Sequence, residues 1–220
     1  LNKSDKRAVR LLRRVRQHRK VKHAFIASGI RFDLLAYQQG YFEELLAHHV
    51  GGLLKVAPES VSEGVTCIMR KPGPKLFVDF LRQFWAFGRQ HGRRQGVVPY
   101  FISSHPGCTL SDMVDVALFL CRHGLKVEQV QEFTPTPGTL STCMYYTGRD
   151  PFTGQTVHVP RTQKEKRLQK ALLLYHLPES RNDVIEALRA SRRQDVAMEL
   201  LGDNGKQRRP LRSRNARTPS

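Results

Sequence analysis

The sequence has 220 residues, 40% of them hydrophobic, which suffices for one sizeable domain with its own core plus an appendage. No apolar run reaches about 18 residues, so no transmembrane helix is expected, and the basic start without a following apolar segment argues against a signal peptide. The formal net charge of +18 is unevenly placed, because residues 1–23 carry +9, residues 161–220 carry +8, and residues 24–160 carry only +1.

The cysteines and the charge distribution narrow the expected partners. The four cysteines, at positions 67, 108, 121 and 143, are widely and irregularly spaced, which predicts neither a disulfide framework nor a zinc site. A reducing cytoplasm is therefore the expected compartment, and no metal ligands are expected in this chain. Because the middle of the chain is nearly neutral, nucleic-acid contact is expected only through the basic flanks, and no membrane contact is expected.

The first predicted element is a helix over residues 4–19. Val9, Leu12 and Val15 recur at helical spacing, and Ser4 is a plausible N-cap. The opposite face is almost entirely Arg and Lys. We interpret that face as the solvated side of a docked helix in preference to a phosphate-binding surface.

Four strands are predicted next, and they cover residues 22–28, 52–57, 97–103 and 126–133. The first three are short and mainly apolar, which is typical of buried parallel strands. The fourth alternates more clearly. Pro99 is unfavourable in a central strand, so we expect it near the start of the third strand.

Helical patterns separate these strands, at residues 41–49, 74–91 and 110–123. Thr109 or Ser111 is expected to cap the last of these helices, and Gly124 to end it in the left-handed region. Alternating strands and helices predict parallel βα units with right-handed crossovers, and hence an α/β fold. The series contains about four such units and looks incomplete.

The remaining chain is predicted to be mostly helical. A turn at residues 150–154 leads to an extended segment at 156–159, and helices are expected at 163–176, 180–190 and 195–201. Ser180 and Asp183 have the spacing of a capping box. Residues 203–220 are polar and basic with almost nothing to bury, which predicts a disordered tail.

Chemistry in parallel α/β folds lies beyond the carboxyl ends of the strands. Polar residues, Gly and Pro follow each predicted strand, at residues 28–33, 55–59, 103–108 and 134–137. Each group has an ordinary alternative, since Ser28 can belong to a tight turn and Lys55 with Glu59 can form a structural ion pair. Cys108 near His105 is a weak candidate for a thiol nucleophile. No Walker loop, nucleophile elbow or zinc-protease motif is present.

These strand-end stretches together resemble the YgiQ family (UPF0313) of radical S-adenosylmethionine proteins. The matching stretches are residues 25–33, 48–59, 69–73, 99–107, 129–133, 144–148 and 170–176. The resemblance implies a partial (βα)6 TIM-like barrel. It also implies a [4Fe-4S] cluster, held by a Cys-x3-Cys-x2-Cys loop, that reductively cleaves S-adenosylmethionine and starts radical chemistry on substrate.

This sequence lacks that cysteine motif. The resemblance therefore implies that residues 1–160 are the C-terminal half of the barrel, with a leading helix at 1–20, followed by a helical extension at 161–202 and the tail at 203–220. The chain is then expected to bind no cluster, to be inactive alone, and to have the missing N-terminal barrel half as its partner. Its substrate stays undefined.

Residue roles follow from the resemblance by position only. The residues expected to face S-adenosylmethionine are Ser28, Lys55, Glu59, Ser103, Ser104 and His105. The residues expected to face substrate are Arg31, Gln131 and Tyr145. The alternatives are a basic nucleic-acid-binding protein, supported by the charge of +18, and a self-sufficient α/β binding module.

Overall fold

The structure is a computed structural model that describes residues 4–35, 37–127 and 130–202. Its elements, in chain order, are α1 (Lys6–Gln17), α2 (Phe32–Leu35), α3 (Gln39–His48), β1 (Leu53–Glu59), α4 (Glu63–Ile68), α5 (Pro74–Gln90), β2 (Gly96–Ser103), α6 (Leu110–Arg122), β3 (Gln131–Glu132), α7 (Leu140–Thr147), α8 (Gln163–Leu173), the short 3₁₀ turn η1 (Pro178–Ser180), α9 (Arg181–Ala190), a second turn η2 (Gln194–Val196) and α10 (Ala197–Leu201). The fold is mixed α/β, as predicted.

A parallel sheet of order β1-β2-β3 organises the chain. The register pairs Leu53 with Gly96 and Val56 with Pro99, and an irregularity follows between Val56 and Glu59. Pro99 therefore lies inside β2 and not near its start, so that expectation is wrong. The strand tolerates a proline there because β3 pairs with β2 only at Ile102 and Ser103, beyond the proline.

Two of the four predicted strands are confirmed and two are much reduced. The segment 22–28 is not a regular strand. Its Ile26 N–H bonds to the His49 carbonyl at the end of α3 (2.9 Å). The chain meets β1 only just after this segment, through the Ile30 N–H bond to the Lys55 carbonyl (3.0 Å) and one bridge between Ile30 and Val56. The fourth strand shrinks to Gln131–Glu132, and residues 128–129 of that prediction lie outside the described residues.

The helix ends test the capping residues that the sequence predicts. Thr109 caps α6 in a full capping box with Asp112, and Gly124 follows the helix at a φ of 62°. The predicted Ser180–Asp183 box does not form, because Ser180 ends a 3₁₀ turn in αR geometry and its side chain cannot reach the following amides. The N-cap of α1 is Asp5, one residue after the predicted Ser4.

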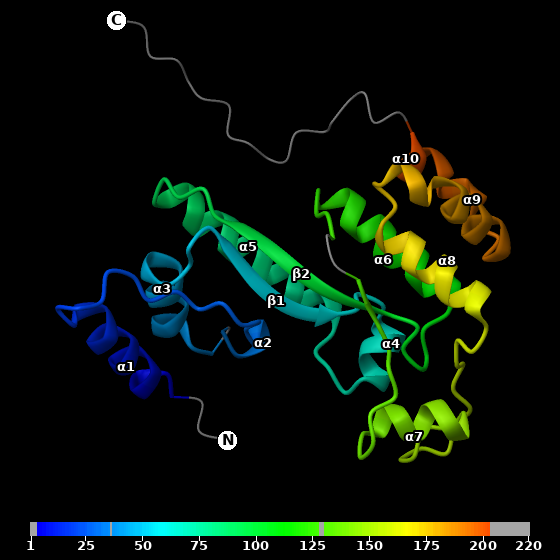
Figure 1. Cartoon of the computed structure of the whole chain (residues 1–220), viewed down its shortest axis with the longest axis horizontal. Helices are drawn as coiled ribbons and strands as arrows, with labels where there is room; N and C mark the ends of the chain where they lie inside the picture. The colour runs from blue at the N-terminus through cyan, green and yellow to red at the C-terminus, as the bar shows by residue number, and fades with distance from the viewer. Residues whose placement is uncertain (1–3, 36, 128–129, 203–220) are drawn as a thin grey trace, which may run out of the picture.

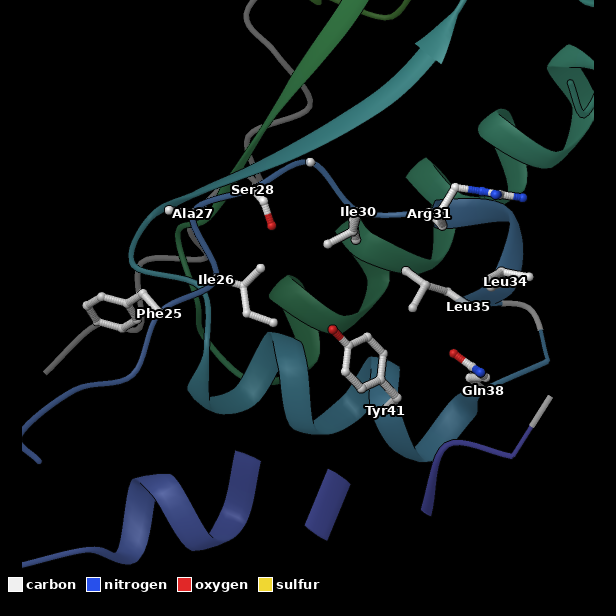
Figure 2. A pocket seen from close by; sticks show the side chains of 11 residues that line it. Phe25, Ile26, Ala27, Ser28, Ile30, Arg31, Leu34, Leu35, Gln38 and Tyr41 are labelled. Carbon is white, nitrogen blue, oxygen red and sulfur yellow. The ribbon is translucent and has the colours of Figure 1, made fainter. Parts of the chain in front are cut away.

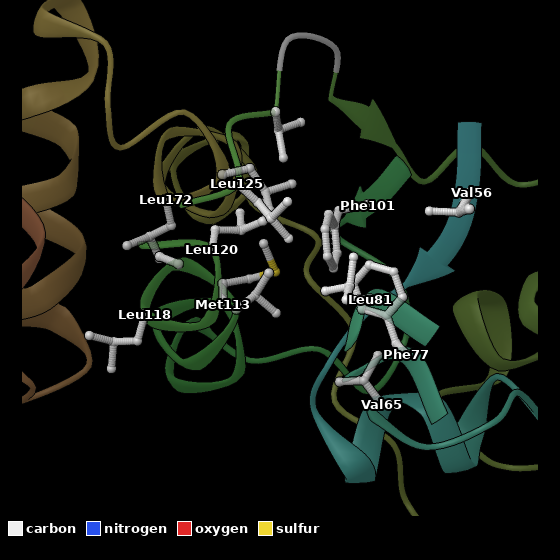
Figure 3. Packing of buried hydrophobic residues seen from close by; sticks show 14 of the residues in the cluster. Val56, Val65, Phe77, Leu81, Phe101, Met113, Leu118, Leu120, Leu125 and Leu172 are labelled. Carbon is white, nitrogen blue, oxygen red and sulfur yellow. The ribbon is translucent and has the colours of Figure 1, made fainter. Parts of the chain in front are cut away.

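The core lies between one face of the sheet and the helices. Phe101 of β2 is fully buried, and Figure 3 shows it between Met113 and Leu120 of α6 on one side and Phe77 and Leu81 of α5 on the other. A buried phenylalanine in such a position typically contributes about 3–5 kcal/mol relative to alanine. The helix stripes predicted from periodicity therefore form the main core.

The other face of the sheet is open. Leu54 and Val56 of β1 are fully buried, whereas Leu53 is 62% exposed and Lys55 is also exposed. In Figure 1, α5 lies behind β1 and β2, and none of the helices in the described residues covers their front. Parallel sheets are normally covered on both faces, so a parallel sheet with one bare face is unusual.

Candidate functional site

Two neighbouring strands end in the same unusual backbone conformation. Glu59, the last residue of β1, has a φ of 65°, and Ser104, directly after β2, has a φ of 64°. Residues other than glycine rarely adopt this left-handed region, and where they do the surrounding structure holds them there, often at functional sites. Because β1 and β2 are parallel neighbours, both residues lie at the same end of the sheet.

Glu59 places a carboxylate at this end. Its Oε1 accepts a hydrogen bond from Lys71 Nζ at 2.8 Å, and its side chain is only 14% exposed. Its Oε2 is buried and has no hydrogen-bond partner among the described residues. A buried carboxylate oxygen without a donor is costly. The oxygen is thus suited to a ligand that presents a hydroxyl or ammonium group.

Ser104 presents a second such atom. The residue is 1% exposed, and its Oγ is buried with no partner among the described residues. Its backbone N–H donates to Gln169 Oε1 at 2.7 Å, and Gln169 Nε2 donates to the Cys108 carbonyl at 2.9 Å. One glutamine side chain from α8 therefore fixes both ends of the loop that follows β2.

His105 is buried beside Ser104, and both of its ring nitrogens are hydrogen-bonded. Its Nδ1 lies 2.7 Å from the Pro106 carbonyl, which requires an N–H there, and its Nε2 lies 2.8 Å from Ser141 Oγ. Burial lowers the pKa of His105, and the nearby charge of Lys71 lowers it further, against the hydrogen bond to Pro106. His105 is therefore a neutral imidazole at pH 7, and its Nε2 accepts from the serine hydroxyl.

An aromatic series leads outward from this histidine. The ring centroids of His105 and Phe133 lie 5.2 Å apart, those of Phe133 and Tyr145 lie 5.8 Å apart, and Arg161 lies 5.2 Å over the Tyr145 ring. Tyr145 thereby lies near the strand ends, and its role toward a substrate stays a prediction. Ser103 and Gln131 also meet, since Ser103 Oγ lies 3.5 Å from the Gln131 carbonyl.

Ser28 and Arg31 belong to a separate region. They line a hollow of about 590 Å³ between the segment beside β1 and α3, into which Ile26, Ile30 and Tyr41 point (Figure 2). Arg31 binds Asp33 through two hydrogen bonds of 2.8 and 2.6 Å, and this pairing lowers the pKa of Asp33. The guanidinium of Arg31 already has a carboxylate partner.

Lys55 lies apart from both groups. Its side chain is exposed on the open face of β1, and within the described residues it forms no ion pair. The alternative Lys55–Glu59 ion pair is therefore wrong, because Glu59 pairs with Lys71. In a regular strand every second residue lies on the same face, so Lys55 and Glu59 would share one. The irregularity after Val56 breaks this alternation, and Glu59 does not lie on the face of Lys55.

The cysteines do not form a cluster site. Cys108 is 1% exposed and burial raises the pKa of its thiol, so it is not the thiolate nucleophile considered above. All four cysteines are free, and no group of three or more His, Cys, Asp or Glu side chains in residues 4–35, 37–127 and 130–202 is arranged to hold a metal ion. These residues do not fit an iron–sulfur cluster.

Three residues of this site escaped the sequence analysis as individual candidates: Lys71, Ser141 and Gln169. Lys71 follows α4, and its position two residues before Gly73 carries no local signal of an ion pair with Glu59. Ser141 lies in the first turn of α7, a helix that was not predicted. The helical pattern predicts Gln169 as a polar residue on the exposed side of an amphipathic helix, whereas the structure buries it fully.

No helix in the described part of the chain has the length and apolarity to cross a bilayer.

Comparison with known proteins gives one domain match and several relatives. The family described as "Domain of unknown function (DUF3362)" matches residues 128–218. The UPF0313 protein GSU2873 of Geobacter sulfurreducens is 60% identical over 196 residues, which cover 89% of this chain and 32% of that protein. A UPF0313 protein of Methanosarcina acetivorans is 47% identical over 89% of this chain and 26% of its own length.

The UPF0313 protein CPE1196 of Clostridium perfringens is 46% identical over 84% of this chain and 28% of its own length. The chain thus spans at most about a third of the length of these relatives.

Proposed function

The chain belongs to the UPF0313 family, and on that premise we propose that it forms the ligand-facing C-terminal part of a radical S-adenosylmethionine enzyme. In this proposal β1, β2 and β3 belong to a partial (βα)6 barrel. The cluster ligands lie in the other part of the enzyme, because the residues here do not fit a cluster. A cluster held by that other part would supply the electron for cleavage of S-adenosylmethionine, and the residues of this chain would bind and orient the adenosyl group and the substrate.

The observation that carries the proposal is the pair of strand ends at Glu59 and Ser104. At each of them a left-handed non-glycine residue carries a buried oxygen that has no hydrogen-bond partner within the described part of the chain. S-Adenosylmethionine carries ribose hydroxyls and an ammonium group, which are the donors that a carboxylate oxygen accepts. Ser104 Oγ, which both donates and accepts, suits either a hydroxyl or a ring nitrogen.

The open face of the sheet supports a barrel that needs more chain to close. Leu53, Lys55 and the partly exposed Tyr100 would face the interior of such a barrel, while Leu54 and Phe101 already face helices. A second part of the enzyme packed on this face would bury Leu53 and cover the sheet as parallel sheets require. The expected partner is therefore the remaining part of a full-length UPF0313 protein, in the same or a separate chain.

Ligand binding by the purified chain tests the proposal. Saturation-transfer NMR with S-adenosylhomocysteine is expected to show transfer to the adenosyl protons, and Glu59→Gln or Ser104→Ala is expected to weaken it at least fivefold. Glu63→Gln, which changes an exposed glutamate of α4, is the matched control and is expected to leave transfer unchanged. Absence of transfer, or equal transfer in all variants, would contradict the site.

A second arm addresses the cluster. After anaerobic reconstitution with iron and sulfide, the chain is expected to show no stoichiometric [4Fe-4S] absorbance. A stoichiometric cluster would show that the ligands lie within this chain and would overturn that part of the proposal. The alternative of a basic nucleic-acid-binding protein is favoured by one separate surface, the basic face of α1.

A further inference from the structure

The exposed face of α1 is strongly basic. Residues 4–22 contain nine Lys or Arg and a single acidic residue, Asp5, and every one of the nine is exposed. Arg7, Arg10 and Arg14 follow one another at helical spacings of three and four, so their side chains lie along one side of the helix. Helix α1 itself lies away from the arrowheads of β1 and β2, and so away from the candidate site (Figure 1).

The charge on this surface is not neutralised by the protein. Arg13 and Arg16 both pair with Glu44, at 2.7 and 3.4 Å. The other seven basic residues of this segment form no ion pair with any residue that the structure describes; they are Lys6, Arg7, Arg10, Arg14, Arg19, Lys20 and Lys22.

Helix α8, which is also rich in Lys and Arg, differs in this respect. Its Lys164 and Arg167 pair with Glu186, and its Lys166 pairs with Glu132. On α8 three of the four basic residues are paired within the described residues, whereas on α1 only Arg13 and Arg16 of six are.

The helix that carries this surface is fixed in place. Glu44 of α3 is 4% exposed at its side chain and receives Arg13, and this arginine together with Arg16 holds the pKa of Glu44 low despite its burial. Asp5 Oδ2 accepts the Tyr41 N–H at 2.9 Å, and Val9 is buried between the helices. The guanidinium groups therefore project from a held scaffold.

A hollow marks where a ligand would lie. It has a volume of about 380 Å³ and is lined by Asp5, Lys6, Val9, Arg10, Arg13, Arg14, Gln17 and Gly40. Lys6, Arg10 and Arg14 thus converge on one concavity. Several long cationic side chains around a concave surface form a site for phosphate groups, which Arg binds in a bidentate manner.

We propose that this surface, defined as Lys6, Arg7, Arg10 and Arg14, binds the phosphate backbone of a single-stranded nucleic acid. This inference is independent of the proposed function. Of the apolar residues of α1, Val9 is buried, whereas Leu11 and Val15 are exposed, so an acidic membrane surface is kept as an outcome of the competition test below. The unpaired charge follows a helix side about 10 Å long from Arg7 to Arg14, which suits several successive phosphates.

The expected binding is salt-dependent and weak in sequence preference. Four phosphate contacts predict a slope of about −3 for log K against log salt with a single strand, which is roughly a fiftyfold loss in affinity between 50 and 200 mM salt. Removing two of the four cations is expected to halve that slope. No base preference is expected, because backbone contacts carry no sequence information.

Fluorescence anisotropy with a labelled 20-nucleotide single-stranded RNA and the matching DNA tests the proposal on the full chain. Arg10→Gln with Arg14→Gln is expected to weaken binding at least tenfold at low salt. The control, Arg89→Gln with Arg189→Gln, removes the same charge from two exposed arginines of α5 and α9 and is expected to change binding less than twofold. Equal effects of the two pairs would overturn the proposal.

Two further arms separate other sources of binding. In a chain ending at residue 202, the two double variants are expected to show the same difference in affinity for the nucleic acid as in the full chain. Loss of that difference would place binding outside α1. Polyglutamate at equal charge, and vesicles containing phosphatidylserine, are expected to compete at least tenfold less well than unlabelled RNA. Competition as strong as that of RNA would overturn the assignment to nucleic acid in favour of an acidic protein or a membrane surface.

Discussion

Gln169 and Ser104 are joined by a 2.7 Å hydrogen bond, from the backbone N–H that follows β2 to the side-chain oxygen of a residue on α8. The side-chain Nε2 of Gln169 donates to the Cys108 carbonyl at 2.9 Å, so both the oxygen and the nitrogen of the Gln169 side chain are hydrogen-bonded. Gln169 lies within the DUF3362 match at residues 128–218, whereas Ser104 does not. One contribution of the matched region to this fold is therefore to hold the loop at the candidate site.

We expect Gln169→Met to destabilise the chain by about 1–3 kcal/mol, because it leaves a buried amide and a buried carbonyl without partners. Urea unfolding measures the loss, and hydrogen exchange is expected to show faster exchange at residues 104–108 in the variant. Gln163→Met, at the exposed first position of the same helix, is the control. If both variants behaved alike, the amide of Gln169 would not be holding the loop.

The left-handed backbone at Ser104 gives a second expectation. Ser104→Gly is expected to be more stable than Ser104→Ala by about 1 kcal/mol, because glycine adopts a φ of 64° without strain. Both variants lack the hydroxyl, so the comparison isolates the backbone. Chemical denaturation of the two proteins side by side measures the difference.

Ser111 supplies the reverse control, since it is exposed in helix α6. There Ser111→Ala is expected to be more stable than Ser111→Gly by up to about 1 kcal/mol, because glycine loses more freedom in a helix. The same order at both positions would contradict the strain assigned to Ser104.

The sequence predicts those elements whose signal is local and repeated. The apolar stripe of α5, the N-cap at Thr109 (one of two candidates) and the apolar run of β1 all act within a few residues, and each appears in the structure. Helices α2, α4 and α7 were not predicted, since each has eight residues or fewer and shows little periodicity; the five-residue α10 was expected as part of the longer segment 195–201. The segment beside β1 has strand-like composition, but composition does not show how many hydrogen bonds it shares with its neighbour.

The candidate site was only partly predictable for the same reason. That Glu59, Ser104 and His105 lie at one end of the sheet follows from the parallel order of β1 and β2. The partners that fix them are distant in sequence, such as Ser141 for His105, 36 positions away, and Gln169 for Ser104, 65 positions away. Those contacts depend on how α7 and α8 pack, which no local pattern encodes.

Glu44 is expected to hold α1 in place. Glu44→Gln removes the charge that receives Arg13 and Arg16, and we expect a loss of about 1–3 kcal/mol together with faster hydrogen exchange in residues 6–17. Glu43→Gln, at the exposed neighbouring position, is expected to have a much smaller effect. Unchanged exchange in α1 after Glu44→Gln would contradict the anchoring role.

The depressed pKa of Glu44 also predicts a pH dependence. A carboxyl whose folded pKa is lower than its unfolded pKa contributes stability that is fully present above the unfolded value and is lost as pH falls through the folded value. Acidification below about pH 4 is therefore expected to narrow the stability difference between the wild-type chain and Glu44→Gln. Urea unfolding at pH 7 and at successively lower pH measures this narrowing.

His105 predicts a pH dependence in a higher range. Burial lowers its folded pKa, so below the unfolded value of about 6.5 the unfolded chain binds a proton that the folded chain does not. Stability is therefore expected to fall from pH 7.5 to pH 5.5, with this residue contributing at most about 1.4 kcal/mol per pH unit. His105→Gln removes the titrating group and is expected to flatten that part of the curve.

The exposed His23 supplies the comparison, because its exposed ring has only the stacked Phe25 as a neighbour among the interactions described. His23→Gln is the matched variant, because it also replaces one histidine by glutamine. Since His48, His123 and His176 also have pKa values lowered by burial, the wild-type slope has several sources, and the informative quantity is the difference between the two variants. A curve for His105→Gln that matches the curve for His23→Gln would show that His105 titrates alike in the folded and unfolded chains. It would then not be the neutral imidazole that accepts the Ser141 hydroxyl.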